Sequence, residues 1–476
     1  MKLHKWLFAI VCILSLFSCS SPKKAVVNST APSSNSRSLP ALPVSQIQIP
    51  VRLYIKPLLA QMDGSMTKEF MSEKWPDYFQ PSCDFRYKYR FVRSPISFSC
   101  INNKVNISFQ GSYQIAGSKS VCAFDKQVSP WVSGSCGFGN EPLRKVDINI
   151  SSLLEVFSRY EVLTTTKLDK LTPRDKCTVS LLQTDMTQEI MDSIRVSVET
   201  YTGSFDRFVQ SLNNSQILQS WRNDGNRVVP VSKYGYLNLQ PTILRMSKFN
   251  YLKDTLAFSL GFSGSPRFSS DSNSLVTPKY LPPFSHTENA GGIATYLDAV
   301  YEYKFLTNLL NDSLRNKPFE VEGRTFVIKN VNLAGSDDGK IKVDVSFDGY
   351  KKGTLHLSGT PVLDSAKQVL SMPDISFSLD SKDMLVNIAK GLLRKRILKQ
   401  LKDQSVLDIA ALIQKNKKDI EARLNQPLNE WLTTQGVFHE LKIVGILSRK
   451  ESIQIQVFVR GNLVVVGTPP VKGLVF

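Results

Sequence analysis

The chain has 476 residues, 42% of them hydrophobic, and a formal net charge of +18. That length exceeds the usual size of a single hydrophobic core, so it predicts two domains or one elongated body. A strong basic excess attracts phosphate groups, and if the chain is exported these belong to lipid headgroups rather than to nucleic acid. The alternative is that the excess is a solvated lysine surface.

The N-terminus predicts an exported, lipid-anchored protein. Lys2 and Lys5 precede an apolar run over residues 6–17, which is too short to span a bilayer and has the length of a secretory signal. The run ends in a sequence that resembles a bacterial lipobox, so we predict a signal peptide over residues 1–18 and lipidation of Cys19. The alternative is an ordinary signal peptide with an incidental cysteine. Residues 19–44 predict a disordered tether, with the body at the bacterial outer membrane and facing the periplasm.

Four segments share one pattern, in which three apolar residues at alternating positions are followed two places later by a glycine. They are residues 105–111, 258–264, 343–349 and 455–461. The alternation predicts half-exposed antiparallel strands, and the polar turn before each segment predicts a hairpin with the preceding apolar run. If the buried faces of the last three segments enclose a ligand, the lining of that seam is Phe258, Leu260, Phe262, Val343, Val345, Phe347, Ile455, Val457 and Val459.

Two longer stretches, residues 190–212 and 407–431, carry apolar residues at spacings of three and four and predict long amphipathic helices. The order of strands and helices predicts two related halves, residues 45–265 and 293–476, joined by a linker over residues 266–292. The expected fold class is α+β, with twisted antiparallel hairpins packed on long amphipathic helices in each half. This architecture is similar to that of the tubular lipid-binding proteins, such as bactericidal permeability-increasing protein.

Cysteine usage agrees with export. Cys122 and Cys136 flank a short loop rich in Pro, Gly and Ser, and we predict that they form a disulfide in an oxidising compartment. The pairing of Cys83, Cys100 and Cys177 stays open. No Cys-x-x-Cys spacing occurs and the histidines are scattered, so the sequence predicts no metal site and no cofactor.

Residues 380–403 predict a helix with an apolar stripe and a basic opposite face. Asp380, Ser381 and Asp383 stand at its start, where acidic and capping residues suit the helix dipole. Such a helix lies on a membrane surface or is a domain helix with a solvated basic face, and the pattern leaves both open.

Several strand and turn segments resemble the successive signatures of one known family. They are Pro230, Val231 and residues 236–241, 256–262, 326–331, 359–364 and 376–385. These segments are similar to domain of unknown function family 4403, which consists largely of bacterial lipoproteins, many of them from Bacteroidetes. The resemblance spans nearly the whole chain after the tether. It implies no activity and no site residues, because the family has no established function.

The chain has no nucleophile elbow, zinc-protease motif, phosphate-binding loop or dinucleotide glycine pattern. We therefore predict a non-enzymatic lipoprotein that binds phospholipid or a fatty acyl ligand in an elongated apolar seam. The alternative is a structural or scaffolding lipoprotein with a packed core, which binds other envelope proteins. A solvent-reachable apolar cavity would distinguish the first function from the second.

Overall fold

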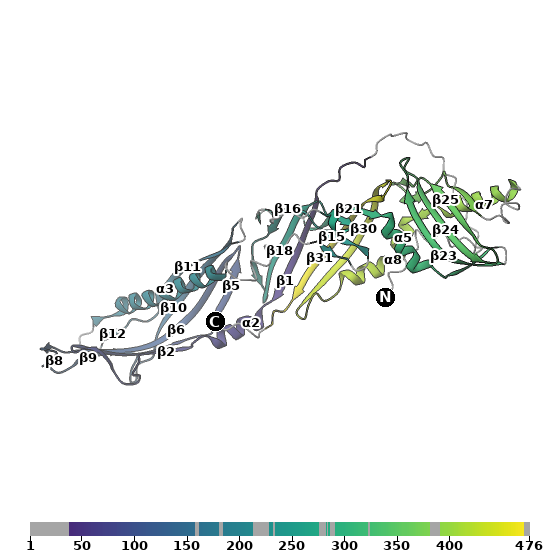
Figure 1. Ribbon diagram of the computed structural model, residues 1–476. Helices are drawn as coiled ribbons and strands as arrows, with labels where there is room; N and C mark the ends of the chain where they lie inside the picture. Colours follow the sequence, from purple (N-terminus) through teal and green to yellow (C-terminus); the bar gives the residue numbers. More distant parts are fainter. Residues whose placement is uncertain are drawn as a thin grey trace.

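The chain forms an elongated body in which a central sheet lies between two outer lobes (Figure 1). The computed structural model describes residues 38–470 apart from 158–160, 180–183, 213–227, 232–233, 276–281, 283, 286–290, 322–323 and 381–390. We call residues 56–212 lobe 1 and residues 303–424 lobe 2. The predicted signal peptide and Cys19 lie outside the described residues.

The central sheet has eleven strands and draws them from both ends of the chain. β1 pairs with β18 along its whole length, with β21 at its start and with the parallel β31 near its end. The strands of this sheet are β1 (Ser45–Tyr54), β14 (Val229–Pro230), β15 (Tyr236–Asn238), β16 (Pro241–Met246), β17 (Asn250–Leu252), β18 (Thr255–Gly264), β19 (Arg267–Ser269), β20 (Phe284–Ser285), β21 (Gly292–Glu302), β30 (Leu432–Ser448) and β31 (Ser452–Gly467). A 3-10 turn, η3 (Ser272–Ser274), follows β19.

Lobe 1 is an eight-stranded antiparallel sheet with a helix, α3 (Thr187–Leu212), packed on one face. Its strands are β2 (Glu69–Met71), β3 (Phe79–Ser82), β4 (Phe85–Arg93), β5 (Ser97–Ile101), β6 (Lys104–Lys119), β9 (Val132–Cys136), β10 (Arg144–Val156) and β11 (Val162–Pro173). Two ribbons, β7 (Cys122–Ala123) with β8 (Lys126–Gln127) and β12 (Thr178–Val179) with β13 (Thr184–Asp185), and a short helix, α2 (Lys56–Ser65), complete it.

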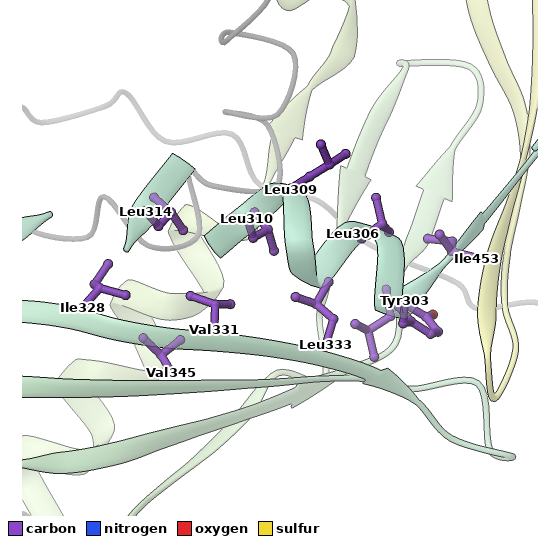
Figure 2. Packing of buried hydrophobic residues seen from close by; sticks show 11 residues of the cluster. Tyr303, Leu306, Leu309, Leu310, Leu314, Ile328, Val331, Leu333, Val345 and Ile453 are labelled. Carbon is purple, nitrogen blue, oxygen red and sulfur yellow. The ribbon is translucent and has the colours of Figure 1, made fainter. Parts of the chain in front are cut away.

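Lobe 2 is a five-stranded antiparallel sheet whose inner face is covered by α5 (Tyr303–Leu314). Figure 2 shows Leu306, Leu310 and Leu314 of this helix above Ile328, Val331 and Val345 of the sheet. The strands are β22 (Pro318–Val321), β23 (Arg324–Gly335), β24 (Ile341–Gly349), β25 (Gly353–Gly359) and β28 (Ser376–Asp380). A small sheet of β26 (Val362–Asp364), β27 (Val369–Ser371) and β29 (Leu407–Asp408) lies beside α7 (Gly391–Gln404) and α8 (Ile409–Leu424).

The hairpin prediction for the four repeated segments is confirmed. They lie in β6, β18, β24 and β31, and each pairs antiparallel with the strand before it. The turn between β5 and β6 has Asn102 and Asn103 at φ 51° and 71°, as a tight hairpin requires. β6 continues past Gly111, so this glycine does not end the strand: a Cβ there would lie 2.3 Å from the ring of Phe91.

The predicted fold class is wrong. Strands make up 54% of the chain and helices about 20%, so the body is mostly β rather than hairpins packed on long helices. The stretch 407–431 is not one helix, because Leu407–Asp408 is strand β29 and α8 ends at Leu424. Apolar residues at spacings of three and four do not show whether part of the segment will instead form a strand that pairs with another strand distant in sequence. The central sheet likewise recruits β19 and β20 from within the expected linker, residues 266–292.

The predicted disulfide between Cys122 and Cys136 is also wrong. Cys122 bonds Cys83, with 6.2 Å between their Cα atoms, and Cys136 bonds Cys177, with 5.6 Å between theirs. Cys136 ends β9, which pairs with β6 and points this side chain into the core of lobe 1. Strand pairing therefore separates two cysteines that are close in sequence. Cys100 is a buried free thiol.

Candidate functional site

Two of the three groups of seam residues share one face of the central sheet. On β18, Phe258 lies opposite Val51 of β1, and Val51 lies opposite Val465 of β31. Residues at alternating positions of a strand point to the same side, so Val465 shares its face with the predicted β31 residues. These are Ile455, Val457 and Val459. The predicted β18 residues Phe258, Leu260 and Phe262 therefore belong to the same surface as the β31 group.

We call this surface the apolar face. Its further members lie opposite the β18 or β31 residues in the strand register, or at alternating positions along the same strands. They are Ile47, Ile49, Val51 and Leu53 of β1, Leu244 and Met246 of β16, Leu256 of β18, Leu297 of β21, and Leu463 and Val465 of β31. One continuous side of the central sheet is thus lined by aliphatic and aromatic side chains.

The two ends of the apolar face differ in how deeply they are buried. At the β30 end, Ile409 and Ile413 of α8 pack on Phe438, and Val459 lies against this cluster. Ile455 similarly packs against the core under α5. At the β18 end, Phe258 and Phe262 are only half-buried and Leu260 is 44% exposed. The accessible part of the apolar face is therefore centred on β18.

The third group of seam residues lies elsewhere, in the sheet of lobe 2. Val345 is 2% exposed and packs below α5 (Figure 2). Phe347 is 7% exposed and lies in a cluster with Phe326 and Leu379. Val343 is partly buried and packs against the core below α5 and against the neighbouring cluster of Leu357 and Leu401. The structure does not bring these three residues to the apolar face, because they fill the interior of their own lobe.

An aromatic row on β4 is a feature that the hydrophobic pattern missed. Phe85 and Tyr89 flank Tyr87 with ring centroids 5.7 Å and 6.3 Å from it, and Phe79 approaches Tyr87 at 5.6 Å. Every residue of β4 from Phe85 to Val92 is half-buried. The row could have been found from the strict alternation of aromatic and basic residues along residues 85–90. It places aromatic rings on one side of β4 and cations on the other.

Two open hollows of the surface are each lined by polar and apolar side chains together. One of about 380 Å³ lies in lobe 1 and is lined by Ser94, Ser108, Asp147 and Lys170 among others. Another of about 550 Å³ is lined by Arg52, Tyr54, Glu430 and Trp431 among others. Arg52 alternates with Val51, so this second hollow is on the side of the sheet opposite to the apolar face. The first hollow lies in lobe 1, so neither hollow is part of the apolar face.

A largely buried ion pair inside lobe 1 ties β4 to α2. Arg93 of β4 is 7% exposed, and its guanidinium donates to the Asp63 carboxylate at 2.5 Å and to the carbonyls of Asp63, Thr67 and Met66. Hydrogen bonding to Arg93 keeps the pKa of Asp63 below its ordinary value. All of these acceptors are in or just after α2, which follows β1 directly. The pair therefore joins the sheet of lobe 1 to the helix that directly follows β1.

A histidine flanked by two carboxylates lies on the outer side of lobe 2. His356 Nδ1 is 2.7 Å from Asp344 Oδ1, and its Nε2 is 3.2 Å from Asp380 Oδ2. Hydrogen bonding to Asp344, supplemented by Asp380, raises the pKa of His356. All three side chains are substantially exposed, so the group is a surface ion cluster. Among the described residues, no set of His, Cys, Asp and Glu side chains is arranged to hold a metal ion.

Comparison with known proteins decides the family. The model for "Domain of unknown function (DUF4403)" matches residues 43–466. The chain belongs to the DUF4403 family. No curated protein matches this member of the family. A crystal structure of lipopolysaccharide binding protein is similar with 12% sequence identity, covering 88% of this chain and 98% of that chain, at a TM-score of 0.21.

In the part of the DUF4403 chain that the structure describes, no helix combines the length and apolar character needed to cross a membrane.

Proposed function

We propose that this DUF4403 protein is a non-enzymatic envelope lipoprotein that holds the acyl chain of a phospholipid or fatty acid on the apolar face. The observation that supports the proposal is the continuity of that face together with the 44% exposure of Leu260 at its centre. A contiguous apolar surface in contact with solvent favours an apolar partner, because water is released when the surface is covered. The proposal includes lipidation of Cys19 and a periplasmic position at the outer membrane.

The dimensions of the apolar face suit an extended chain. From Leu256 to Phe262, β18 presents four apolar side chains over about 20 Å, given a rise near 3.4 Å per residue. The neighbouring β1 presents a matching row from Ile47 to Leu53. Burial of each methylene group contributes about 0.8 kcal/mol, so an acyl chain lying along these rows gains several kcal/mol without a polar contact.

The scaffold function is the second candidate, and the packed core of lobe 2 favours it. Val345 and Phe347 have almost no exposed surface to offer a ligand, and the sheet around them forms a packed platform. A scaffold would use such a platform to bind other envelope proteins without binding lipid. The two functions therefore differ in whether the isolated protein takes up an apolar chain.

A fluorescent fatty acid tests the proposal directly. The full chain with Cys19→Ala, which removes the proposed anchor, should bind the probe saturably and should carry phospholipid or fatty acid into an organic extract. Leu260→Asp places a charge at the exposed centre of the apolar face, where water can still solvate it. This substitution should weaken probe binding at least tenfold, because an acyl chain cannot cover a carboxylate without desolvating it.

Leu252→Asp is the matched control. Leu252 is 71% exposed at the β17–β18 turn, so the same substitution adds the same charge away from the centre of the apolar face. Its probe affinity should equal that of the parent. A parent protein that binds no probe and yields a lipid-free extract would overturn the lipid function and leave the scaffold.

A further inference from the structure

The side of β4 opposite to its aromatic row carries two cations that are held by aromatic rings. Arg86 and Lys88 alternate with Phe85, Tyr87 and Tyr89, so they point to the other face of the lobe 1 sheet. There they meet rings supplied by the loops around the sheet: Tyr78 before β3, Trp131 before β9 and Phe138 after β9. We call Arg86, Lys88 and these three rings the cation cluster.

The rings orient both charges. The guanidinium carbon of Arg86 is 4.5 Å from the Tyr78 ring centroid and 4.4 Å from that of Trp131. The Lys88 ammonium is 4.8 Å from the Tyr78 centroid and 5.4 Å from that of Phe138. The two cations thus share the ring of Tyr78. Rings that cover a planar guanidinium leave its N–H edge as the part available for hydrogen bonds.

The charge of the cation cluster is not neutralised by acidic neighbours. Arg90 on the same strand side pairs with Glu69, and Arg93 pairs with Asp63. Within the described residues, by contrast, no carboxylate forms an ion pair with Arg86 or Lys88, and the buried Nε of Arg86 has no hydrogen-bond partner. Lys88 donates once, to the carbonyl of Pro76 at 3.1 Å. The enclosed Nε is out of reach of a ligand, but the two positive charges without a carboxylate partner favour an anion at this place.

We propose that the cation cluster binds the phosphate group of a phosphate ester, carried by a sugar or by a lipid headgroup. The guanidinium edge of Arg86 offers parallel N–H donors that match two phosphate oxygens, and the Lys88 ammonium supplies a second positive charge to the same group. The site is on lobe 1 and is separate from the apolar face of the central sheet. Phosphate binding at the cation cluster therefore does not depend on acyl-chain binding at the apolar face.

Two probes separate the possible sources of the phosphate. Binding of glucose 6-phosphate by calorimetry reports a soluble ester, and binding to phosphatidylcholine vesicles with and without phosphatidic acid reports a headgroup. Both use the full chain with Cys19→Ala. Arg86→Gln should weaken binding of the recognised probe by about thirtyfold, and Lys88→Gln by about tenfold, because each loses one charge-assisted contact. Arg86→Lys keeps the charge without the paired donors and should recover only part of the loss.

Lys415→Gln with Lys418→Gln is the control for non-specific attraction. Both lysines are exposed on α8, and the double variant removes at least as much positive charge as either test variant. Its affinity should match that of the parent, as should that of Leu260→Asp. If the parent binds neither probe, or if the α8 variant loses as much affinity as Lys88→Gln, the proposal is overturned. Lys88→Gln also gives a result if Arg86→Gln does not fold, because Lys88 has only two ring contacts and one hydrogen bond to lose.

Discussion

Truncation of Phe347 to alanine tests whether lobe 2 is a packed core or part of a ligand seam. The ring is 7% exposed and meets the Phe326 ring edge-to-face, with centroids 5.5 Å apart and planes at 87°. Phe319 approaches from another side at 6.2 Å, and Leu379 completes the cluster. Removing a phenyl ring that is almost completely enclosed leaves a cavity and costs about 3–5 kcal/mol, of which each lost edge-to-face contact contributes about 0.5–1.5 kcal/mol.

Hydrogen exchange read by mass spectrometry localises this loss. In Phe347→Ala, amides of β23 and β24 should exchange roughly a hundredfold to a few thousandfold faster than in the parent, while those of β10 in lobe 1 keep their rates. Leu260→Ala is the comparison, because that side chain is 44% exposed and its truncation should cost below about 1 kcal/mol. Equal effects of the two substitutions, or a loss below about 1 kcal/mol in Phe347→Ala, would refute the assignment of Phe347 to a packed core.

Three further outcomes are expected. Peptide mapping without reductant should recover Cys136 bonded to Cys177, and recovery of free thiols would contradict this pairing. Cys136→Ser should destabilise lobe 1 by about 4 kcal/mol, because the bond closes a loop with a sequence separation of 41. Asp63→Asn should cost about 1–3 kcal/mol at pH 7. The folded-state pKa of Asp63 is lowered by Arg93, so its contribution is present above the unfolded pKa of about 3.9 and disappears as pH falls through the lower folded value. The stability difference between parent and Asp63→Asn should then shrink below about pH 4, and a difference that is constant from pH 7 to pH 3 would count against the ion pair. Mass spectrometry of the membrane-bound protein should find the N-terminus at Cys19 with attached acyl chains, whereas an unmodified cysteine would indicate an ordinary signal peptide.

Local pattern was sufficient for the hairpins. The alternation of apolar residues before Gly111, Gly264, Gly349 and Gly461 predicted four strands, and the polar pairs before them predicted their turns. Both features depend on contacts between residues close in sequence, where the two-residue period and the turn chemistry leave little choice. The family resemblance was found from the same strand and turn residues, and the family match over residues 43–466 confirms it.

Only the tertiary structure decided how those hairpins combine. The alternating patterns of β18, β24 and β31 are alike, yet β24 fills a closed core while β18 keeps Leu260 in solvent. Alternation shows that one face of a strand is apolar and does not show whether a helix covers it, as α5 covers β24. The pairing of Cys136 with Cys177 depends likewise on β9 joining β6, which brings together residues with a sequence separation of 41. Burial and disulfide pairing are set by contacts distant in sequence, and a local period carries no information about them.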